Sequence, residues 1–460
     1  MAMDLRVLLV NAINPHVEVE RRYPNLGLGY LVSSVRQAFA DQNINLRIID
    51  SKVASEADQF CPHLVGISSV SQNFTIARNY ADFFAERSVP VILGGVHISA
   101  LPTSMPRNVV AACLGEGEQT FVDIIRTCLD EGLCPDNMVD IPGIAYWEDD
   151  KLHVTRPRPL IAELDSLPMP ARDLLHIRPH TYMFTSRGCP YRCRFCASSR
   201  FWDNVRFFSA EYVVNEIELL VRKYDAKMIS FFDDLFVAER SRLEEIVRLL
   251  EKRKILSKVK FTTNCRANVI DEELVGLLSR MGIVSVGMGL ESGDDDILHY
   301  LKGNSVNVED NYKAINYLKK AGISANASFV IGSPPETRKQ IMKTYDFIRQ
   351  SNLDLFDVYL LTPFPGTPIW EYAIKKGLLD NDMEDWSCLD VNLYRAPEKV
   401  IFLSEVLEKE ELIVLYKKFR RLRFRRNLFK VWKHPMLRDL PGMAWKLFLE
   451  KVVELKGVCT

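Results

Sequence analysis

The sequence predicts an α/β protein with an N-terminal doubly wound, Rossmann-like domain, a partial (β/α)6 barrel and a helical C-terminal region. Three observations support this fold class. Short apolar runs alternate with amphipathic helical patterns through residues 1–140, six further strand–helix units extend to about residue 365, and the last hundred residues have a mostly helical pattern. Alternating strands and helices favour parallel sheets with helices packed on their faces.

Residues 1–140 form the predicted Rossmann-like domain. Apolar runs predict its strands at 5–10, 46–49, 64–68, 89–93 and 109–114. Between the third and fourth strands a helix is expected, because four apolar residues share one face at 3.6-residue spacing: Phe74, Ala77, Ala81 and Phe84. Ligands of such sheets bind beyond the carboxyl ends of the strands. Two glycine-bearing turns fall there, and they contain Gly94, Gly95, His97, Gly115 and Glu116.

Residues 141–180 are predicted to be a linker. Two short runs, 144–147 and 152–155, are compatible with a small hairpin around residues 148–151. A proline-rich stretch follows, from Pro157 to Pro170. Proline continues neither a helix nor a central strand, so this stretch indicates a strap between domains.

The barrel is predicted over residues 181–370, followed by a helical domain at 371–460. Its strands are expected at 183–186, 228–232, 259–263, 284–289, 325–331 and 356–361. The first helix has Ser209 as its expected N-cap. Later helices are expected at 240–253, 271–281, 308–321 and 336–350. The chemistry of a parallel barrel lies at the carboxyl ends of its strands.

Three cysteines follow the first barrel strand at the spacing C-x3-C-x2-C: Cys189, Cys193 and Cys196. Thiolates so close in sequence can converge on one small metal centre. A cubane iron–sulfur cluster has four irons, each normally bound by a cysteine, so three ligands leave one iron open. The alternatives are a zinc knuckle or three unrelated core cysteines. Zinc usually takes four ligands, and no second Cys or His pair follows at finger spacing.

This cysteine segment resembles the signature of the radical S-adenosylmethionine (radical SAM) family, in which Phe195 fills the aromatic position before the third cysteine. The resemblance implies a 4Fe-4S cluster on the three cysteines. It also implies that SAM chelates the open iron and is cleaved reductively to a radical that abstracts hydrogen from substrate.

The other strand ends of the predicted barrel carry further matches to this family. The resemblance implies SAM contacts at an acidic turn after the second strand, an arginine after the third, a glycine–glutamate segment after the fourth and a turn after the fifth. The residues concerned are Phe232, Asp233, Asp234, Arg266, Gly289, Glu291 and Ile331. An arginine suits a bidentate grip on a carboxylate. Taken alone, the acid pair equally fits a helix N-terminus, and the arginine an ordinary ion pair.

From about residue 5 to 430 the chain resembles the cobalamin (B12)-binding subgroup of this family. The resemblance implies that Gly94, Gly95, His97, Gly115 and Glu116 contact cobalamin. The D-x-H-x-x-G pattern, whose histidine ligates cobalt from below, is absent from the sequence. His16 and His97 lie near strand ends outside that context. A turn residue hydrogen-bonded to backbone is an equally good interpretation of His97.

The resemblance implies a cobalamin-dependent C-methyltransferase. Its methyl group would pass from cobalamin to a substrate radical, and a second SAM would restore it. The alternative is a non-methylating radical SAM enzyme, a cyclase, ring-contraction enzyme or dehydratase, with or without cobalamin. A metal-holding regulatory or electron-transfer protein is a third possibility of a different class. The expected partners are a small-molecule or lipid substrate and an external electron donor of flavodoxin or ferredoxin type.

The composition and the charge of the chain limit its expected partners and cellular compartment. The net charge of −1 creates no field that would attract nucleic acid, so no nucleic acid partner is expected. Ten irregularly spaced cysteines do not resemble a secreted disulfide framework. The N-terminus lacks the pattern of a signal peptide, and no apolar run approaches the length of about 18 residues that spans a bilayer. We therefore expect a cytoplasmic protein.

A basic stretch near the C-terminus has three interpretations. Between Lys417 and Arg438 there are ten Lys or Arg and no acidic residue, with aromatics at Phe419, Phe424, Phe429 and Trp432. A solvated helical face is the plain interpretation. An amphipathic segment on an anionic membrane would suit a lipid substrate. A nucleic-acid groove has no other support in the sequence.

Overall fold

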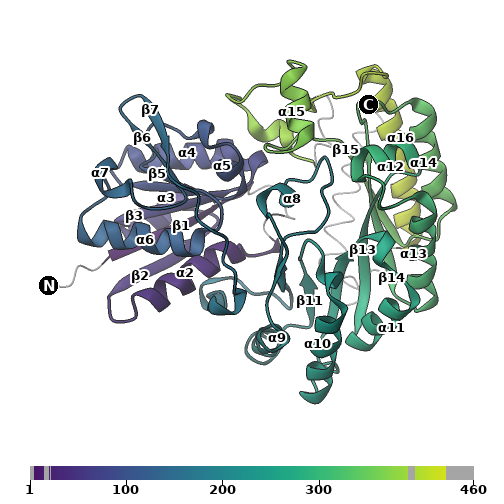
Figure 1. The fold of residues 1–460 in the computed structure, drawn as a ribbon, viewed down its shortest axis with the longest axis horizontal. Helices are drawn as coiled ribbons and strands as arrows, with labels where there is room; N and C mark the ends of the chain where they lie inside the picture. The colour runs from purple at the N-terminus through teal and green to yellow at the C-terminus, as the bar shows by residue number, and fades with distance from the viewer. Residues whose placement is uncertain (1–4, 15–19, 21, 392–398, 431–460) are drawn as a thin grey trace. The chain divides into compact units, whose positions relative to one another are not determined.

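The computed structural model describes residues 5–14, 20, 22–391 and 399–430, whose helices and strands are labelled in Figure 1. The chain forms two compact units. Unit 1 comprises Met1–Asn264, Tyr300–Gly303 and Leu361–Leu403, and unit 2 comprises Cys265–His299, Asn304–Leu360 and Ser404–Thr460.

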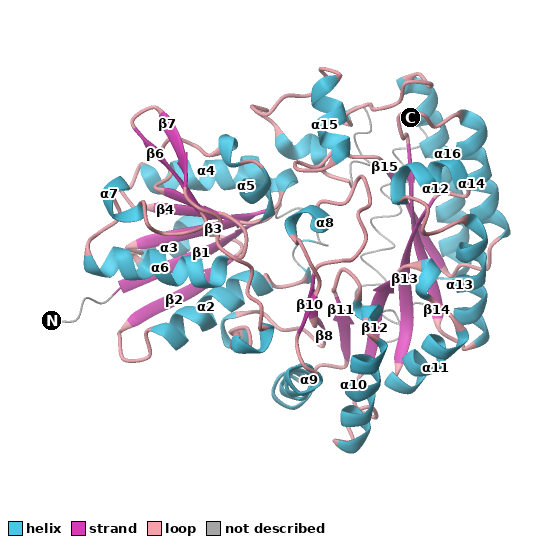
Figure 2. Cartoon of the chain, viewed as in Figure 1, coloured by secondary structure: helices cyan, strands magenta, loops and turns pink. Residues whose placement is uncertain are grey.

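Unit 1 begins with a seven-stranded sheet in the order β2-β1-β3-β4-β5-β6-β7 (Figure 2). Its strands are β1 (Leu5–Ala12), β2 (Ile44–Ile49), β3 (Leu64–Ser69), β4 (Val91–Gly94), β5 (Ala111–Cys113), β6 (Ile144–Glu148) and β7 (Lys151–Val154). The first five pair in parallel, as the doubly wound fold requires. The hairpin expected within 141–180 is β6–β7, and it extends this sheet by antiparallel pairing with β5.

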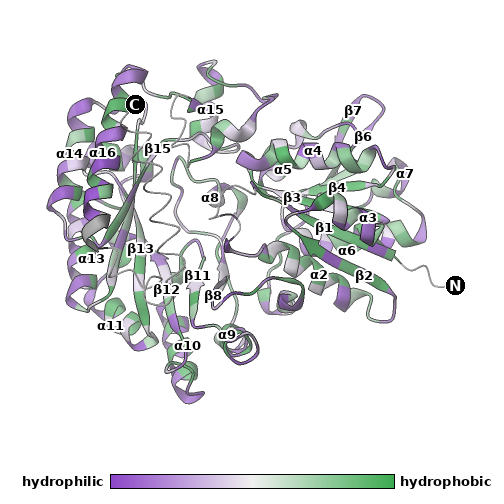
Figure 3. Cartoon of the chain, turned by 180° about the vertical axis from the view of Figure 1, so that it is seen from behind, coloured by the Kyte–Doolittle hydropathy of each residue, from purple (hydrophilic) through white to green (hydrophobic). Residues whose placement is uncertain are grey.

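Both faces of this sheet are buried, which follows from the period-2 alternation of its strands. In β1, Leu8 and Val10 face one core while Val7 and Leu9 face the other. One core is covered by α3 (Val53–Phe60), α4 (Phe74–Ala85) and α5 (Val96–Ala100), and the other by α2 (Leu26–Ala38), α6 (Gly117–Asp130) and α7 (Pro135–Met138). Figure 3 shows the hydrophobic colouring of β3 and β4.

The predicted apolar face of α4 is confirmed, since Phe74, Ala77, Ala81 and Phe84 are all buried. Two later segments complete the same core. They are α15 (Pro368–Lys375) and the short 3-10 helix η7 (Trp386–Leu389), which contribute Trp370 and Trp386.

Unit 1 also contains the first strands of the predicted barrel. Strands β8 (His180–Met183), β11 (Met228–Phe231) and β12 (Lys260–Cys265) are parallel, with α9 (Ala210–Tyr224) and α10 (Arg240–Lys252) following β8 and β11 along the chain. Ser209 caps α9 as expected, because its hydroxyl accepts the Tyr212 amide at 3.1 Å.

The first barrel strand was expected at 183–186, and that placement is wrong. Strand β8 ends at Met183 because the Asp233 carboxylate accepts the Thr185 amide at 2.8 Å and removes that N–H from any strand ladder. Ser186 and Arg187 then form β9, which pairs antiparallel with β10 (Arg206–Phe207).

Unit 2 supplies three more parallel strands: β13 (Ile283–Glu291), β14 (Ser324–Ile331) and β15 (Leu355–Leu360). Its helices are α11 (Glu272–Met281), α13 (Val308–Lys320), α14 (Arg338–Gln350) and α16 (Lys409–Lys430), and α12 (Asp295–Lys302) carries residues of both units. All six expected barrel strands are therefore present. Among the described residues, no helix is long and apolar enough to cross a membrane.

Candidate active site

The three cysteines lie on one loop, residues 188–205, which we call the cysteine loop. Strands β9 and β10 close it, with Arg187 and Arg206 as register partners. Gly188, at the start of the loop, has a φ of +95°, and a β-carbon there would lie 2.3 Å from the Asn204 carbonyl oxygen. Only glycine fits this close approach, so the loop can close tightly at its base.

The donor set of the cysteine loop suits an iron–sulfur cluster. Cys189, Cys193 and Cys196 are free thiols. Burial raises the pKa of the Cys189 and Cys196 thiols, and the nearby charges of Asp234 and the other cysteines add to the rise. In the described part of the chain, no group of three or more His, Cys, Asp or Glu side chains lies in a metal-holding arrangement. Binding of a cluster would therefore draw the sulfurs together and release their protons.

The acidic turn after β11 contains two side chains with different roles. Asp233 is buried, and its Oδ1 accepts hydrogen bonds from the Thr185 amide at 2.8 Å, the Thr185 hydroxyl at 2.9 Å and the Ser186 hydroxyl at 2.6 Å. Asp234 instead accepts the Gly188 amide at 3.2 Å and the Ser198 hydroxyl at 2.5 Å, at the two ends of the cysteine segment. Asp233 thus holds β8 to β9, and Asp234 faces the cysteines.

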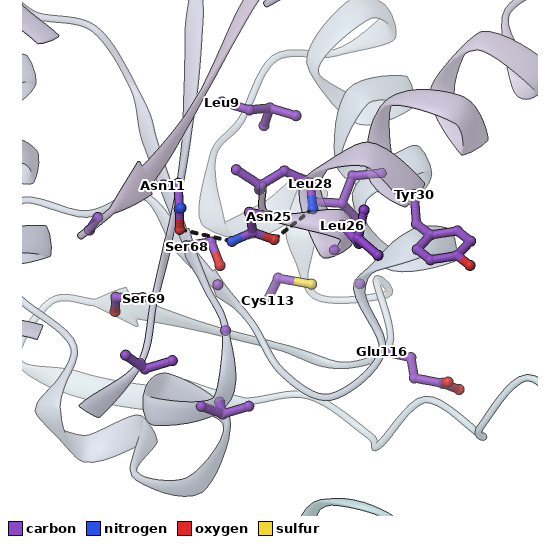
Figure 4. Close-up of a pocket in the computed structure, with 18 of the residues that line it drawn as sticks. Leu9, Asn11, Asn25, Leu26, Leu28, Tyr30, Ser68, Ser69, Cys113 and Glu116 are labelled. Atoms are coloured by element: carbon purple, nitrogen blue, oxygen red, sulfur yellow. Dashed lines mark hydrogen bonds between the residues drawn. The ribbon is translucent and has the colours of Figure 1, made fainter. Parts of the chain in front are cut away.

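A cavity of about 650 Å³ lies within unit 1 and reaches the cysteine loop. One wall is formed by the carboxyl ends of β1, β3 and β4, the turn after β5, and the start of α2. Figure 4 shows this wall, including Asn25, which donates to Asn11 at 2.9 Å and caps α2 by accepting the Leu28 amide at 3.1 Å. The opposite wall is formed by Phe232, Asp234, two residues of α8 (Ser198–Phe201) with Trp202, and four residues near β8 and β9: Tyr182, Phe184, Ser186 and Arg187.

Glycines keep the first wall open. A β-carbon at Gly94 or Gly115 would meet no atom within 4 Å, so any side chain there would project into free space. Gly95 is required for a different reason, since its φ is +105° and a β-carbon would lie 2.4 Å from the Ser69 carbonyl oxygen. All three residues line the cavity. This open, glycine-lined edge of a parallel sheet fits a large, rigid ligand such as cobalamin.

Glu116 lines the cavity, but its carboxylate is bound by arginines. Oε1 accepts from Arg187 at 2.5 Å, and Oε2 accepts from Arg206 at 2.8 Å and from the Ile161 amide at 2.7 Å. Burial alone would raise the pKa of the Glu116 carboxyl, but the Arg206 hydrogen bond and the Arg187 charge hold it below its ordinary value. Glu116 is thus ionised and fully engaged with protein groups.

His97 does not line the cavity with its neighbours. Its ring is buried beside Phe74 and Trp386, with centroid distances of 3.9 and 4.3 Å. Its Nδ1 lies 3.2 Å from the Ser71 hydroxyl and its Nε2 3.1 Å from the Ser104 hydroxyl. Burial lowers the His97 pKa to about 3. This is the structural role that sequence analysis left open, with serine hydroxyls as partners. His16 lies outside the described residues.

The second wall is aromatic. Phe232 is 37% exposed, and its ring packs against Tyr23 and Tyr182 at centroid distances of 4.9 and 4.8 Å. Phe195, in the cysteine loop, is partly buried. Phe184, Arg187 and Trp202 also line the cavity and were not among the predicted site residues. The only local signal was the position of Arg187, two residues before the first cysteine.

The remaining predicted SAM contacts belong to unit 2. Arg266 is buried and donates to Asn268 at 3.0 Å and to the Ser305 hydroxyl at 2.7 Å. Strand β13 has a register irregularity between Gly289 and Glu291, and Glu291 has a φ of +60°. Ile331 ends β14 and is buried. Their contacts with SAM stay predictions.

The turn after Ile331 is held by a buried carboxylate. The amides of Gly332 and Ser333 donate to Glu336 Oε2 at 2.7 and 3.2 Å. Burial raises the pKa of the Glu336 carboxyl to about 8 despite these hydrogen bonds. The turn at the end of β14 is therefore ordered by its own sequence.

The sequence comparisons agree with this geometry. Residues 183–348 match the family model of the radical SAM superfamily, and residues 16–125 match the B12 binding domain. An uncharacterized methyltransferase, PH0819, from Pyrococcus horikoshii is 32% identical over 379 residues, which cover 77% of this chain and 80% of the relative. The chain belongs to the radical SAM superfamily. It is a radical SAM enzyme with a B12 binding domain, and its cofactors are a 4Fe-4S cluster, SAM and cobalamin.

Two further relatives of this radical SAM enzyme are informative. The anaerobic magnesium-protoporphyrin IX monomethyl ester cyclase of Rubrivivax gelatinosus is 27% identical over 393 residues, covering 80% of this chain and 70% of the relative. The solved structure of the radical SAM methyltransferase TsrM from Kitasatospora setae, bound to tryptophan and a SAM analog, matches with a TM-score of 0.67. That match has 19% identity and covers 80% of this chain and 76% of TsrM, so it shows the shared fold.

Proposed function

We propose that this protein is a cobalamin-dependent C-methyltransferase. The observation that carries the proposal is a single cavity walled on one side by the glycine turns of the B12 binding domain and on the other by the cysteine loop and Asp234. The methyltransferase name of the Pyrococcus horikoshii relative supports it. When bound, the cluster with SAM supplies a hydrogen-abstracting radical, and cobalamin supplies a methyl group.

We assign the chain's own residues the following roles. Cys189, Cys193 and Cys196 would hold the cluster. Asp234 fixes the cysteine segment at Gly188 and Ser198. Gly94 and Gly115 leave the space that a corrin needs. The aromatic wall around Phe232 excludes water from a reacting radical, which would otherwise be exposed to side reactions.

An anaerobic product assay tests methyl transfer. The full-length protein, reconstituted with cluster and cobalamin, is incubated with SAM, a chemical reductant and a mixture of candidate small-molecule methyl acceptors. We expect S-adenosylhomocysteine to accumulate alongside 5′-deoxyadenosine, and only when cobalamin is present. If 5′-deoxyadenosine forms without S-adenosylhomocysteine in the cobalamin-loaded protein, the methyltransferase proposal is wrong.

A non-methylating radical reaction is the second candidate, because the Rubrivivax gelatinosus relative is named a cyclase. Ring closure consumes SAM only as the hydrogen-abstracting reagent. It therefore predicts 5′-deoxyadenosine as the sole SAM-derived nucleoside product. The same assay separates the two candidates.

The enzyme acts on a small-molecule substrate and needs a reductant. We propose a flavodoxin or ferredoxin as that reductant and the reducing cytoplasm as the compartment. The nine described cysteines are all free thiols, which agrees with a reducing compartment. Depleting either flavodoxin or ferredoxin in cells that produce this protein would show which reductant sustains product formation.

We further propose peripheral contact with an anionic membrane through α16, which would suit a lipid substrate. One face of α16 packs into unit 2 through Leu412, Leu415 and Phe419, which are buried. Another face exposes Lys417, Lys418, Arg421 and Arg425. Of the aromatics in the basic stretch, Phe424 is partly buried, while the side chain of Phe429 and all of Trp432 lie outside the described residues.

Charge reversal on the intact chain tests membrane contact. Replacing Lys417, Arg421 and Arg425 by glutamate leaves the buried face of α16 unchanged. We expect the affinity for phosphatidylserine vesicles, measured by sedimentation, to fall by about a hundredfold or more, because each of the three cations near an anionic surface contributes about 1 kcal/mol. Equal sedimentation of the variant and the wild type would remove the proposal.

A further inference from the structure

A buried ion cluster joins the two walls of the cavity. Arg187 donates to Glu116 and to Glu118, each at 2.5 Å, and Arg206 donates to Glu116 at 2.8 Å. None of these four side chains is more than 11% exposed. Charge-assisted hydrogen bonds in a dry environment hold a fixed geometry, and removing one partner leaves an uncompensated buried charge.

The four residues come from two segments of the chain, the base of the cysteine loop and the start of α6. Arg187 and Arg206 are register partners at the closed base of the cysteine loop, and Arg187 is two residues from Cys189. Glu116 is the N-cap residue of α6 and Glu118 lies in its first turn, and both line the cavity. The two carboxylates therefore belong to the wall formed by the B12 binding domain. The two arginines flank the loop that carries the predicted cluster ligands.

We propose that Glu116 and Glu118 are positioning residues, which orient the cysteine loop through Arg187 and Arg206 so that cobalamin in the cavity orders the cluster-binding segment. This inference rests on the proposed function, because it requires cobalamin to occupy the glycine-lined cavity. A ligand against residues 115–117 fixes the backbone of that turn. Glu116 and Glu118, at the start of α6, then hold the planar Arg187 guanidinium through its two terminal nitrogens.

The bidentate geometry explains why arginine is needed at position 187. Its guanidinium binds Glu116 through one terminal nitrogen and Glu118 through the other. A lysine ammonium is a point charge and holds no fixed plane between two carboxylates. Glu116 also accepts the Ile161 amide, and Arg206 donates to the Ile161 carbonyl at 2.6 Å, so the cluster is anchored to the strap as well.

Hydrogen–deuterium exchange of the full-length, cluster-free protein tests the coupling. Exchange of residues 188–205 is measured with and without aquacobalamin, and bound aquacobalamin is measured by its visible absorbance after gel filtration. In the wild type we expect aquacobalamin to slow exchange in the loop by about tenfold. In Glu116→Gln the loop should exchange rapidly with or without aquacobalamin. Glu118→Gln and Arg187→Lys should have intermediate effects.

Two control variants separate coupling from general destabilisation. Glu216→Gln breaks the buried Arg172–Glu216 pair, and neither residue lines the cavity. Asp123→Asn weakens the Arg158 pair on the same helix as Glu118. Both controls should keep the response of the loop to aquacobalamin, even where thermal stability falls.

The outcomes are distinct. If wild type retains aquacobalamin but the loop does not respond, or if Glu116→Gln responds as wild type does, the coupling is overturned and the proposed function survives. If wild type retains no aquacobalamin, the proposed function itself fails. A second readout is the iron and sulfide taken up after anaerobic reconstitution, which should fall in Glu116→Gln, recover partly in Glu116→Asp and stay at the wild-type level in both controls.

Discussion

The two walls of the cavity differ in the residues that shape them. On the B12 binding domain, glycines lie among the side chains of the wall, and Gly94 and Gly115 leave unfilled space. On the cysteine side, the wall consists of side chains, among them Phe232, Trp202 and Asp234. Under the proposed function, the first wall would make room for cobalamin and the second would hold the cluster-binding segment.

The same contrast separates neighbours within each wall. Asp234 faces the cysteine loop, while the carboxylate of Asp233 turns inward to bind Thr185 and Ser186. Gly94 opens into the cavity, while His97, three residues later, is buried between two serine hydroxyls. A motif therefore does not assign one role to all its residues.

The largest expected effect is the loss of SAM cleavage, without loss of cobalamin, when the three cysteines are replaced. Replacing Cys189, Cys193 and Cys196 together by alanine removes every thiolate of the loop. We expect no 5′-deoxyadenosine above the enzyme-free control, because SAM cleavage needs the cluster. Cobalamin retention should be unchanged, since the other wall is intact. Loss of cobalamin in this variant would contradict the division between the walls.

Filling the space beside the glycines should have the opposite pattern, with weaker cobalamin binding and retained SAM cleavage. Gly94→Leu places a side chain in the free space of the cavity, and we expect cobalamin to bind at least roughly tenfold more weakly. Reductive cleavage of SAM should persist. Equilibrium dialysis measures the first effect, and the 5′-deoxyadenosine assay measures the second.

Gly276→Leu is the matched control for that experiment. A β-carbon at Gly276 also meets nothing within 4 Å, but this exposed residue of α11 does not line the cavity. Its cobalamin affinity should equal that of the wild type. Equal affinity in Gly94→Leu as well would show that cobalamin does not use this cavity.

His97 should contribute to the stability of the fold and not to cobalamin binding. His97→Ala empties a packed site and removes the contacts of the ring with the Ser71 and Ser104 hydroxyls, which we expect to lower the free energy of unfolding by about 2–4 kcal/mol. Cobalamin occupancy and its absorbance spectrum should not change. Chemical denaturation and visible spectroscopy measure the two properties. A changed spectrum in the variant would mean that His97 contacts the corrin after all.

The His97 contribution should depend on pH with a definite sign. Burial lowers its pKa from 6.5 to about 3 in the folded protein, so the unfolded chain binds the proton more tightly. The stability advantage of wild type over His97→Ala is complete above pH 6.5. It should shrink by about 1.4 kcal/mol per pH unit as the pH falls towards 3. Denaturation at a series of pH values measures this trend, and a constant difference would refute it.

The smallest expected effect separates the two aspartates. Asp233→Asn weakens hydrogen bonds between the turn and β9, and we expect unfolding to become easier by about 1–3 kcal/mol. Asp234→Asn should have a smaller effect on stability but a larger effect on SAM cleavage, because Asp234 holds both ends of the cysteine segment. Equal losses of cleavage in the two variants would show that the aspartates share one role.

Much of the fold follows from local sequence. Buried parallel strands produce apolar runs, and the expected strands of both sheets are present, as is the Ser209 cap. The cysteine spacing identified the loop because its three cysteines are close in sequence. The sequence could not predict the direction of individual side chains, as the different partners of Asp233 and Asp234 show. It also could not predict partners that are distant in sequence, since the Arg187–Glu116 and Arg206–Glu116 pairs join residues 71 and 90 positions apart.

The end of β8 shows a third kind of failure. Local propensity extended this strand to 186, but a carboxylate 48 residues away binds the Thr185 amide and stops it at Met183. The domain boundaries at 140, 180 and 370 stay predictions. The basic stretch beyond residue 430 lies outside the described residues.

Electron paramagnetic resonance of the anaerobically reconstituted, reduced protein tests the central claim most directly. A cluster held by three cysteines with one open iron predicts a signal whose g values shift when SAM is added, with no shift when 5′-methylthioadenosine, which lacks the amino and carboxylate groups of SAM, replaces it. A wild-type protein that assembles no cluster, or a cluster whose signal ignores SAM, would contradict the claim.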